Sequence, residues 1–352
     1  DSVPPQASYE ERPGLWVEGN QWPLQSQTIN FNLSSSGQLT DVKTKGKVSV
    51  QSPLTTGSAS GEYCVIWCGP DFPTDQRQDD INSLCFDTEP LENSVSILGA
   101  SEFKVAITSD QDCGQIIVRL CDVSPSGSSK RISYGVLNLA MRNGLDCPKL
   151  VVAGEVMNVS IKLDDTGYQL PAGHRLRLAV SSAYFPLIWP APKKAKLTLD
   201  LASSCLTIPC HDRSATLVRD LGQGYVCPVK KTQKIRPEKH ERLIQTDAKD
   251  GLVSTIINDD FGEFTFLEHN LTVGESCNER HSILPDDPYS ASSECRWHSH
   301  QSRPGWDINI YTQLKVTCDG DYFYLNSNIE ALENGVQIHQ SQYQEKLPRG
   351  FS

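Results

Sequence analysis

Long apolar runs and basic charge are both scarce in this 352-residue sequence. Its longest uncharged apolar stretch, 184–192, has about half of the ~20 residues that a membrane-spanning helix needs, so no membrane span is expected. Forty-three acidic side chains against 32 basic ones give a net charge of −11. That charge repels phosphate backbones and anionic lipids, so neither nucleic acid nor a membrane surface is expected as a partner.

The motifs of several large enzyme classes are also missing. No Gly-x-Ser-x-Gly nucleophile elbow is present, and the similar segment Gly57-Ser-Ala-Ser-Gly61 has an alanine at its centre, so we interpret it as a flexible loop. Neither a Walker loop nor Gly-x-Gly-x-x-Gly occurs, which leaves nucleotide binding without support. We therefore assign no catalytic residue and no cofactor-binding residue.

The chain end and the cysteines bear on cellular context. The sequence starts at Asp1 without an initiator methionine, so we expect a fragment or a processed product whose targeting signals are not visible. Its twelve cysteines lack the dense spacing of a disulfide-stapled domain, and three glycosylation sequons are within chance. The cellular compartment is therefore not determined, but the wide spacing of the cysteines favours reduced thiols and thus the cytoplasm.

Period-two alternation of apolar and polar residues dominates the chain. It predicts half-buried antiparallel strands at 157–163, 175–180 and 197–201, and an unusually long strand at 306–316 whose apolar phase places Trp306 in the core. Asp319-Gly320 and Asn334-Gly335 follow as hairpin signals, because these residues tolerate the positive φ of primed turns. The C-terminal region is therefore predicted to be a β-meander.

Many short strands separated by glycine, proline, asparagine and aspartate indicate an all-β fold, a β-sandwich or jelly roll. The one expected helix is a short turn at 74–82. We expect an extended lead-in over 1–28, a β-sandwich over 29–213, and an antiparallel β region over 214–352.

Candidate metal ligands are few. His298 and His300 would share one face of a strand with Glu294, but a solvated polar face explains all three. Recurrent aspartate doublets could hold calcium, although turn formation accounts for most of them. The pairs Cys64–Cys68 and Cys205–Cys210 do not have zinc-knuckle spacing, and packing or a local disulfide suits them better. No metal-binding residue is assigned.

Aromatic and histidine side chains offer two further candidates. Tryptophans on a β-sandwich can form platforms on which sugars stack. Trp189 and Trp306 are expected to pack, whereas Trp67 is expected near a rim. His174, at the start of a strand, is interpreted as a hydrogen-bonded structural residue.

Several ordered segments resemble a known family. They are Asp75-Gln-Arg77, Leu84-Cys-Phe-Asp-Thr-Glu-Pro-Leu91, Val118-Arg-Leu-Cys-Asp-Val-Ser-Pro-Ser-Gly127, Ser133-Tyr-Gly-Val-Leu-Asn138, and Pro171-Ala-Gly-His-Arg-Leu-Arg-Leu-Ala-Val-Ser-Ser-Ala-Tyr-Phe-Pro186. Together they look like the C-terminal region of X-Pro dipeptidyl-peptidases and cocaine-esterase-type hydrolases, over roughly residues 1–210. The resemblance implies a galactose-binding-like jelly roll followed by a second antiparallel β region.

The same resemblance implies a partner and a division of labour. In this family an α/β-hydrolase domain with a Ser-Asp-His triad comes first, so all three triad residues would lie upstream of Asp1 and none transfers to this chain. The chain would be the non-catalytic portion of a serine hydrolase that acts on acyl esters, amides or X-Pro peptides. Asp75, Gln76 and Arg77, with Trp67, are candidate residues of the interface with the hydrolase domain.

Other positions and readings remain open. Asp122, Arg175 and Arg177 resemble family positions of structural role, and a homo-oligomer is possible. Two alternatives are an independent carbohydrate- or ligand-binding module and an adhesive ectodomain.

Overall fold

The computed structural model describes residues 4–9, 14–18, 22, 27–62, 70–211, 217–218, 222 and 224–351. Strands dominate this part of the chain, and its one α-helix is the short α1 (Arg77–Asp80), where the sequence predicts a helical turn. The predicted all-β class is therefore confirmed. Within the same residues, no helix has the length and apolar character to cross a membrane.

The chain divides into two compact units. The described residues up to Gly222, except Pro70, form the first unit together with Phe351, and Pro70 joins Gly224–Gly350 in the second. A compact unit is not by itself an independently folding domain. The bounds 1–28, 29–213 and 214–352 therefore stay predictions.

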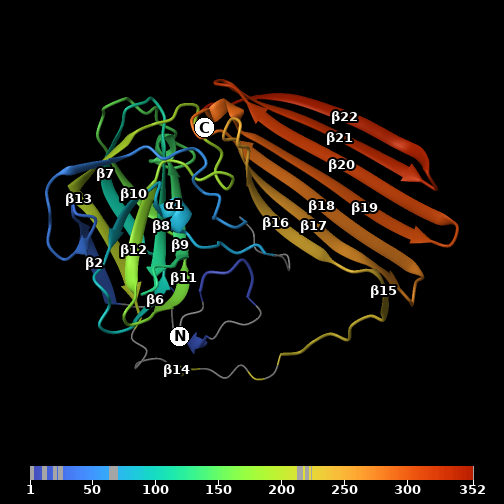
Figure 1. Cartoon of the computed structure of the whole chain (residues 1–352), viewed down its shortest axis with the longest axis horizontal. Coiled ribbons are helices and arrows are strands. Elements are labelled where there is room, and N and C mark those ends of the chain that lie inside the picture. Colours follow the sequence, from blue (N-terminus) through green and yellow to red (C-terminus); the bar gives the residue numbers. More distant parts are fainter. Residues whose placement is uncertain are drawn as a thin grey trace. The chain divides into compact units, whose positions relative to one another are not determined.

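The first unit is a jelly-roll β-sandwich (Figure 1). Its larger sheet has the order β10-β7-β13-β2-β3, with β4 and β6 also paired to β13 and β11 paired to β6. Its smaller sheet has the order β5-β12-β8-β9. The strands of the larger sheet are β2 (Gln27–Leu33), β3 (Leu39–Thr40), β4 (Lys47–Val50), β6 (Val95–Gly99), β7 (Glu102–Ser109), β10 (Met157–Lys162), β11 (Thr166–Leu170) and β13 (Leu197–Cys210). Those of the smaller sheet are β5 (Leu84–Asp87), β8 (Gln115–Val123), β9 (Ser129–Asn138) and β12 (Arg175–Ser181). A separate short pair joins β1 (Val17–Glu18) to β14 (Leu217–Val218).

One continuous apolar core lies between these two sheets. Strand β10 shows the expected alternation, because Met157, Val159 and Ile161 are buried while the residues between them are exposed. In contrast, every residue of β8 is buried. Both faces of β8 are therefore covered, which sets the environment of its polar side chains Arg119 and Asp122.

The second unit is one long antiparallel sheet in the order β15-β17-β18-β19-β20-β21-β22, with β16 also paired to β17 (Figure 1). Its strands are β15 (Thr232–Arg236), β16 (Lys239–Thr246), β17 (Val253–Phe266), β18 (Leu271–Ile283), β19 (Ser292–Arg303), β20 (Trp306–Cys318), β21 (Tyr322–Glu333) and β22 (Val336–Pro348). Sequential strands from β17 to β22 pair with their neighbours, so the predicted meander is confirmed.

The two predicted hairpin turns differ in geometry. Asn334 (φ 50°) and Gly335 (φ 78°) both have the positive φ of a primed turn between β21 and β22. Between β20 and β21 the loop has three residues, and Asp319 Oδ1 accepts hydrogen bonds from the backbone N–H groups of Asp321 and Tyr322, both at 2.8 Å. Both signals therefore mark real turns, but only Asn334-Gly335 forms the primed type.

The expectation that Trp306 lies in a core is wrong. Trp306 is 36 % exposed and Leu314, on the same strand β20, is 40 % exposed. The described residues of the second unit form a single sheet with no second sheet stacked on it. Alternation along a strand identifies two faces, but it does not say that either face is covered.

Candidate functional site

The predicted interface residues Asp75 and Arg77 lie at the start of α1, where Asp75 precedes the helix and Arg77 is its first residue. Asp75 Oδ1 accepts hydrogen bonds from the backbone N–H of Arg77 at 3.1 Å and of Ser129 at 3.2 Å, and its other oxygen pairs with the Arg77 guanidinium at 2.7 Å. The Arg77 side chain is 61 % exposed. This cap closes the turn and joins it to the start of β9, and it leaves Arg77 facing solvent.

Gln76, the middle residue of the same trio, lies entirely inside the jelly roll. Its Nε2 donates to the carbonyls of Ala59 and Thr74, both at 2.8 Å. Its Oε1 accepts hydrogen bonds from Arg119 at 3.1 Å and from the Tyr184 hydroxyl at 3.3 Å. Both ends of the Gln76 amide are thus used within the chain, and of the trio only Asp75 and Arg77 reach the surface.

A charged network surrounds Gln76. Arg119, fully buried, pairs with Asp80 at 3.0 Å, and Arg177 pairs with Asp80 at 2.8 Å and with Asp87 at 2.7 Å. Removing one partner from such a buried group leaves an uncompensated charge, which typically costs about 3–5 kcal/mol. The network therefore fixes α1 against β8 and β12, consistent with a structural role for Arg177.

Asp79 extends this network to the segment Gly57–Gly61. Its carboxylate accepts hydrogen bonds from the backbone N–H groups of Gly57 at 2.9 Å and Ala59 at 3.3 Å. Burial raises the pKa of Asp79 above its ordinary value. Ala59 and Ser60 are 1 % exposed, so the interpretation of this segment as a flexible loop is wrong. Sequence alone could not show that the loop is held by a carboxylate some 20 residues further along the chain.

A second buried cluster contains His174. Its Nδ1 lies 2.6 Å from Asp122 Oδ1, while Asp122 Oδ2 accepts a hydrogen bond from the Tyr168 hydroxyl at 2.8 Å. These contacts link β8 to β11 and to the start of β12. His174 is thus hydrogen-bonded as expected, and the structural role of Asp122 stays a prediction.

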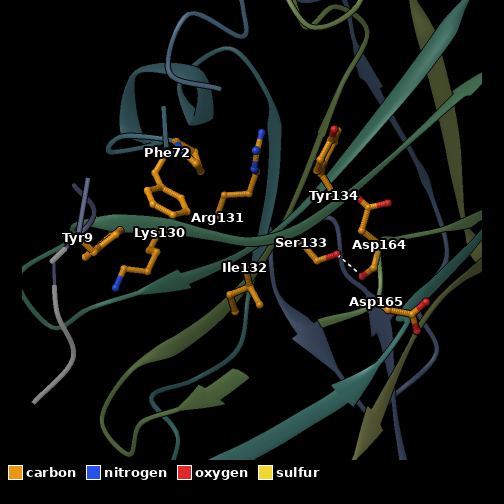
Figure 2. Close-up of a pocket in the computed structure, with 10 residues that line it drawn as sticks. Tyr9, Phe72, Lys130, Arg131, Ile132, Ser133, Tyr134, Asp164 and Asp165 are labelled. Atoms are coloured by element: carbon orange, nitrogen blue, oxygen red, sulfur yellow. Dashed lines mark hydrogen bonds between the residues drawn. The ribbon is translucent and has the colours of Figure 1, made fainter. Parts of the chain in front are cut away.

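A hollow of about 250 Å³ opens on the first unit beside β9 (Figure 2). Phe72 packs edge-on against Tyr9, with ring centres 5.4 Å apart, and the Lys130 ammonium lies 5.5 Å from the Tyr9 ring centre. Asp164 and Asp165 are exposed at the opposite side. The full lining is Tyr9, Phe72, Pro73, Lys130, Arg131, Ile132, Ser133, Tyr134, Asp164 and Asp165.

Arg131 connects the hollow to the buried network. Its guanidinium lies 4.4 Å from the Tyr134 ring centre and donates a hydrogen bond to the Tyr184 hydroxyl at 2.7 Å. Because Tyr184 also contacts Gln76, the floor of the hollow is rigidly tied to the interior. Sequence reasoning did not find this surface, since it joins segments that lie far apart in the chain.

The other described sequence candidates lie elsewhere in the chain. Trp67, like Cys64 and Cys68, lies outside the described residues. The Trp189 ring packs edge-on against Phe185 with ring centres 6.1 Å apart, as expected for a packing residue. In the second unit, His298 bonds Asn309 at 2.9 Å, and His300 bonds Asp307 at 2.9 Å. Glu294 instead pairs with Arg296 at 2.6 Å, so this set does not converge on one point.

Comparisons with known proteins agree on one family. Residues 3–243 match the family model described as the X-Pro dipeptidyl-peptidase C-terminal non-catalytic domain. The cocaine esterase of Rhodococcus sp. (strain MB1 Bresler) is 27 % identical over 188 residues, which cover 49 % of this chain and 32 % of the esterase. The Xaa-Pro dipeptidyl-peptidase of Streptococcus pneumoniae serotype 19F (strain G54) is 34 % identical over 106 residues, covering 30 % of this chain and 14 % of that protein.

Two solved hydrolase structures match part of the chain. An aminopeptidase from a marine sediment archaeon, Thaumarchaeota archaeon, gives a TM-score of 0.47 at 17 % identity, with 55 % of this chain and 38 % of that chain covered. An α-amino acid ester hydrolase gives a TM-score of 0.45 at 18 % identity, with 52 % of this chain and 36 % of that chain covered. The chain thus spans about a third or less of the curated relatives that it matches.

Proposed function

Because this chain belongs to the family of X-Pro dipeptidyl-peptidase C-terminal non-catalytic domains, we propose that it is the accessory β portion of a serine hydrolase, packed against an α/β-hydrolase domain of the same parent protein. The substrates of that parent would be acyl esters, amides or X-Pro peptides. The match to a non-catalytic family over residues 3–243 is the observation that carries the proposal. The chemistry of bond cleavage would belong to the partner domain, and this chain would support and shape its active site.

The hollow beside β9 is the surface that we assign to this contact. It offers two aromatic rings, Tyr9 and Phe72, next to the cation of Lys130. Aromatic rings and arginines, such as Arg131 of the same hollow, recur at the centres of protein interfaces, because they bury a large area on binding. The hydrogen bond from Arg131 to Tyr184 keeps the surface in one arrangement before docking, which lowers the entropy cost of association.

The predicted interface residues fit beside this hollow. Asp75 is bonded to the backbone of Ser129, the first residue of β9, and the next residues of β9 line the hollow. Exposed Arg77 can therefore contact the same partner, whereas Gln76 acts from inside by holding Arg119 and Tyr184 in place. Trp67 stays a prediction.

The first test measures docking of this chain onto the α/β-hydrolase domain of its parent by isothermal titration calorimetry. Phe72→Ala removes a ring that lines the hollow and should weaken binding about tenfold or more. Asp165→Lys reverses an exposed charge at its rim and should change affinity several-fold, mainly through the association rate.

The matched control is Asp146→Lys, which makes the same charge change at an exposed position outside the hollow. Unchanged binding by Phe72→Ala and Asp165→Lys would contradict the assigned surface. Labelling of a serine in the 352-residue chain alone by a fluorophosphonate probe would instead contradict the non-catalytic role.

A further inference from the structure

Two thiols and a carboxylate meet on one face of the second unit. Cys277 and Glu279 lie on β18 and Cys295 lies on β19. The Cys277 Sγ is 3.6 Å from the Cys295 Sγ and 3.6 Å from the Glu279 Oε1, and ligand atoms of all three residues lie within 4.8 Å of one another. None of these residues belongs to the hollow described above.

Two of these separations match those of a tetrahedral metal site. With Zn–S bonds of about 2.3 Å and Zn–O bonds of about 2.0 Å, tetrahedral angles place two ligand sulfurs ~3.8 Å apart and a sulfur and an oxygen ~3.5 Å apart. The observed 3.6 Å for both pairs is within a few tenths of an ångström of these values. A cation could therefore enter with small side-chain rotations and no change of the strands.

The strand register argues against a disulfide between the same thiols. Cys277 is paired directly with Trp297, and Cys295 is paired with Glu279, so the two cysteines are diagonal neighbours. Diagonal positions in an antiparallel pair are typically about 7–8 Å apart at Cα, beyond the ~6.8 Å that a disulfide spans. A metal bridge holds the sulfurs at close to their present separation, whereas a disulfide requires the strands to shift.

Charge balance at this cluster favours a cation. Two thiolates and Glu279 carry three negative charges, which a divalent cation and the neighbouring Arg242 guanidinium would neutralise. Asp259, beside Cys277, is separately paired with His240 at 2.9 Å.

His281 contacts the carboxylate of Glu279 and orients it. Its Nε2 is 3.0 Å from Glu279 Oε2, and its Nδ1 is 2.8 Å from the Ser293 hydroxyl. Ligand carboxylates in metal sites are commonly oriented by such a hydrogen bond. The Glu279 side chain is 33 % exposed, which gives a cation a route from solvent.

We propose that Cys277, Cys295 and Glu279 bind a zinc-class divalent cation, with the fourth position open to water. On binding, each thiol S–H bond breaks, an S–metal bond forms, and two protons leave to solvent with no change of oxidation state. The bound cation would bridge β18 and β19 and stabilise the second unit.

The test titrates the reduced 352-residue chain with Co²⁺ alone and follows the visible absorption of tetrahedral cobalt and the sulfur-to-cobalt charge-transfer band. One cobalt per chain is expected, with displacement by Zn²⁺. Glu279→Gln should lower the affinity at least about tenfold, and Cys295→Ser should weaken the charge-transfer band. His281→Ala, a change in a positioning residue, should lower the affinity while keeping both sulfur ligands.

Cys227→Ser is the control, because Cys227 is an exposed thiol of the same unit, and it should leave binding unchanged. Circular dichroism checks that each variant folds, and if Cys295→Ser does not fold, the affinity of Glu279→Gln decides. A charge-transfer band left unchanged by Cys295→Ser, or a Cys277–Cys295 disulfide in the chain purified without reductant, would overturn the proposal.

Discussion

Arg119 shows how the jelly roll accommodates charge in its interior. The side chain is fully buried, yet its guanidinium meets Asp80, Gln76 and the Ser83 hydroxyl. An isolated charge in such a place would be very costly, so each partner is required. The same logic explains why Gln76, in a segment that sequence reasoning assigned to an interface, is used inside the molecule.

Two thiols and a tyrosine hydroxyl buried in this region should make the protein less stable at alkaline pH. Burial raises the pKa of Cys121 and of Cys85 from 9.0 to about 12, and that of Tyr184 from 10.0 to about 12. At pH values between the ordinary and the raised pKa of each group, the folded chain holds protons that the unfolded chain has lost. These groups should therefore leave the free energy of unfolding unchanged below pH ~9. As the pH rises toward ~12, each group should lower it by about 1.4 kcal/mol per pH unit.

Urea unfolding at a series of alkaline pH values checks this expectation. Cys121→Ala should reduce the slope of the free energy of unfolding against pH by the contribution of one proton, because the alanine side chain has no proton to lose. Cys147→Ala, at an exposed position, is the comparison. An identical pH dependence in the Cys121→Ala and unaltered chains would show that Cys121 is not the group responsible.

At the scale of single elements, a substitution in the turn between β21 and β22 should measurably lower the free energy of unfolding. Gly335 has φ 78°, and no atom outside its chain neighbours lies within 4 Å of an added Cβ. Gly335→Ala therefore acts through backbone conformation alone and should reduce the free energy of unfolding by about 1–2 kcal/mol. Urea denaturation measures the change. Gly224→Ala, also in open space but without a positive φ, should have a smaller effect, and equal effects would contradict the argument.

Strands and turns were the features most accessible from sequence. Alternation in β10 and the Asn334-Gly335 signal depend on neighbouring residues only, so local rules suffice. Whether a sheet face is covered depends instead on residues far apart in the sequence, which is why the exposed position of Trp306 was missed.

The candidate sites required information beyond local pattern. The hollow joins Tyr9, Phe72, Lys130 and Asp164, which meet only after the jelly roll has formed. Cys277 and Cys295 become neighbours through the register of β18 with β19, which no spacing rule specifies. The family resemblance located the Asp75–Arg77 segment, but it could not separate its buried residue from its exposed ones.

At the scale of the whole molecule, the two units differ in how they are stabilised. The large apolar core cluster lies within the first unit, between Leu33 and Ile208. In the second unit the buried apolar side chains are few, among them Ile256, Ile257 and Ile283. Burial of apolar surface is the dominant favourable contribution to folding, so the first unit should be the more stable of the two.

Amide hydrogen exchange followed by mass spectrometry measures this difference strand by strand. Every residue of β8 is buried, whereas all but one residue of β22 is exposed, although both strands pair along their length. Peptides from β8 should therefore exchange through openings close to global unfolding, and peptides from β22 through openings several kcal/mol lower, within the roughly 5–15 kcal/mol typical of domains. Adding Zn²⁺ should slow exchange in β18 and β19 and leave β8 unchanged, because a cation held between those strands stabilises only its own unit. Equal opening free energies in β8 and β22 would mean that the two units unfold as one cooperative body, despite their unequal cores.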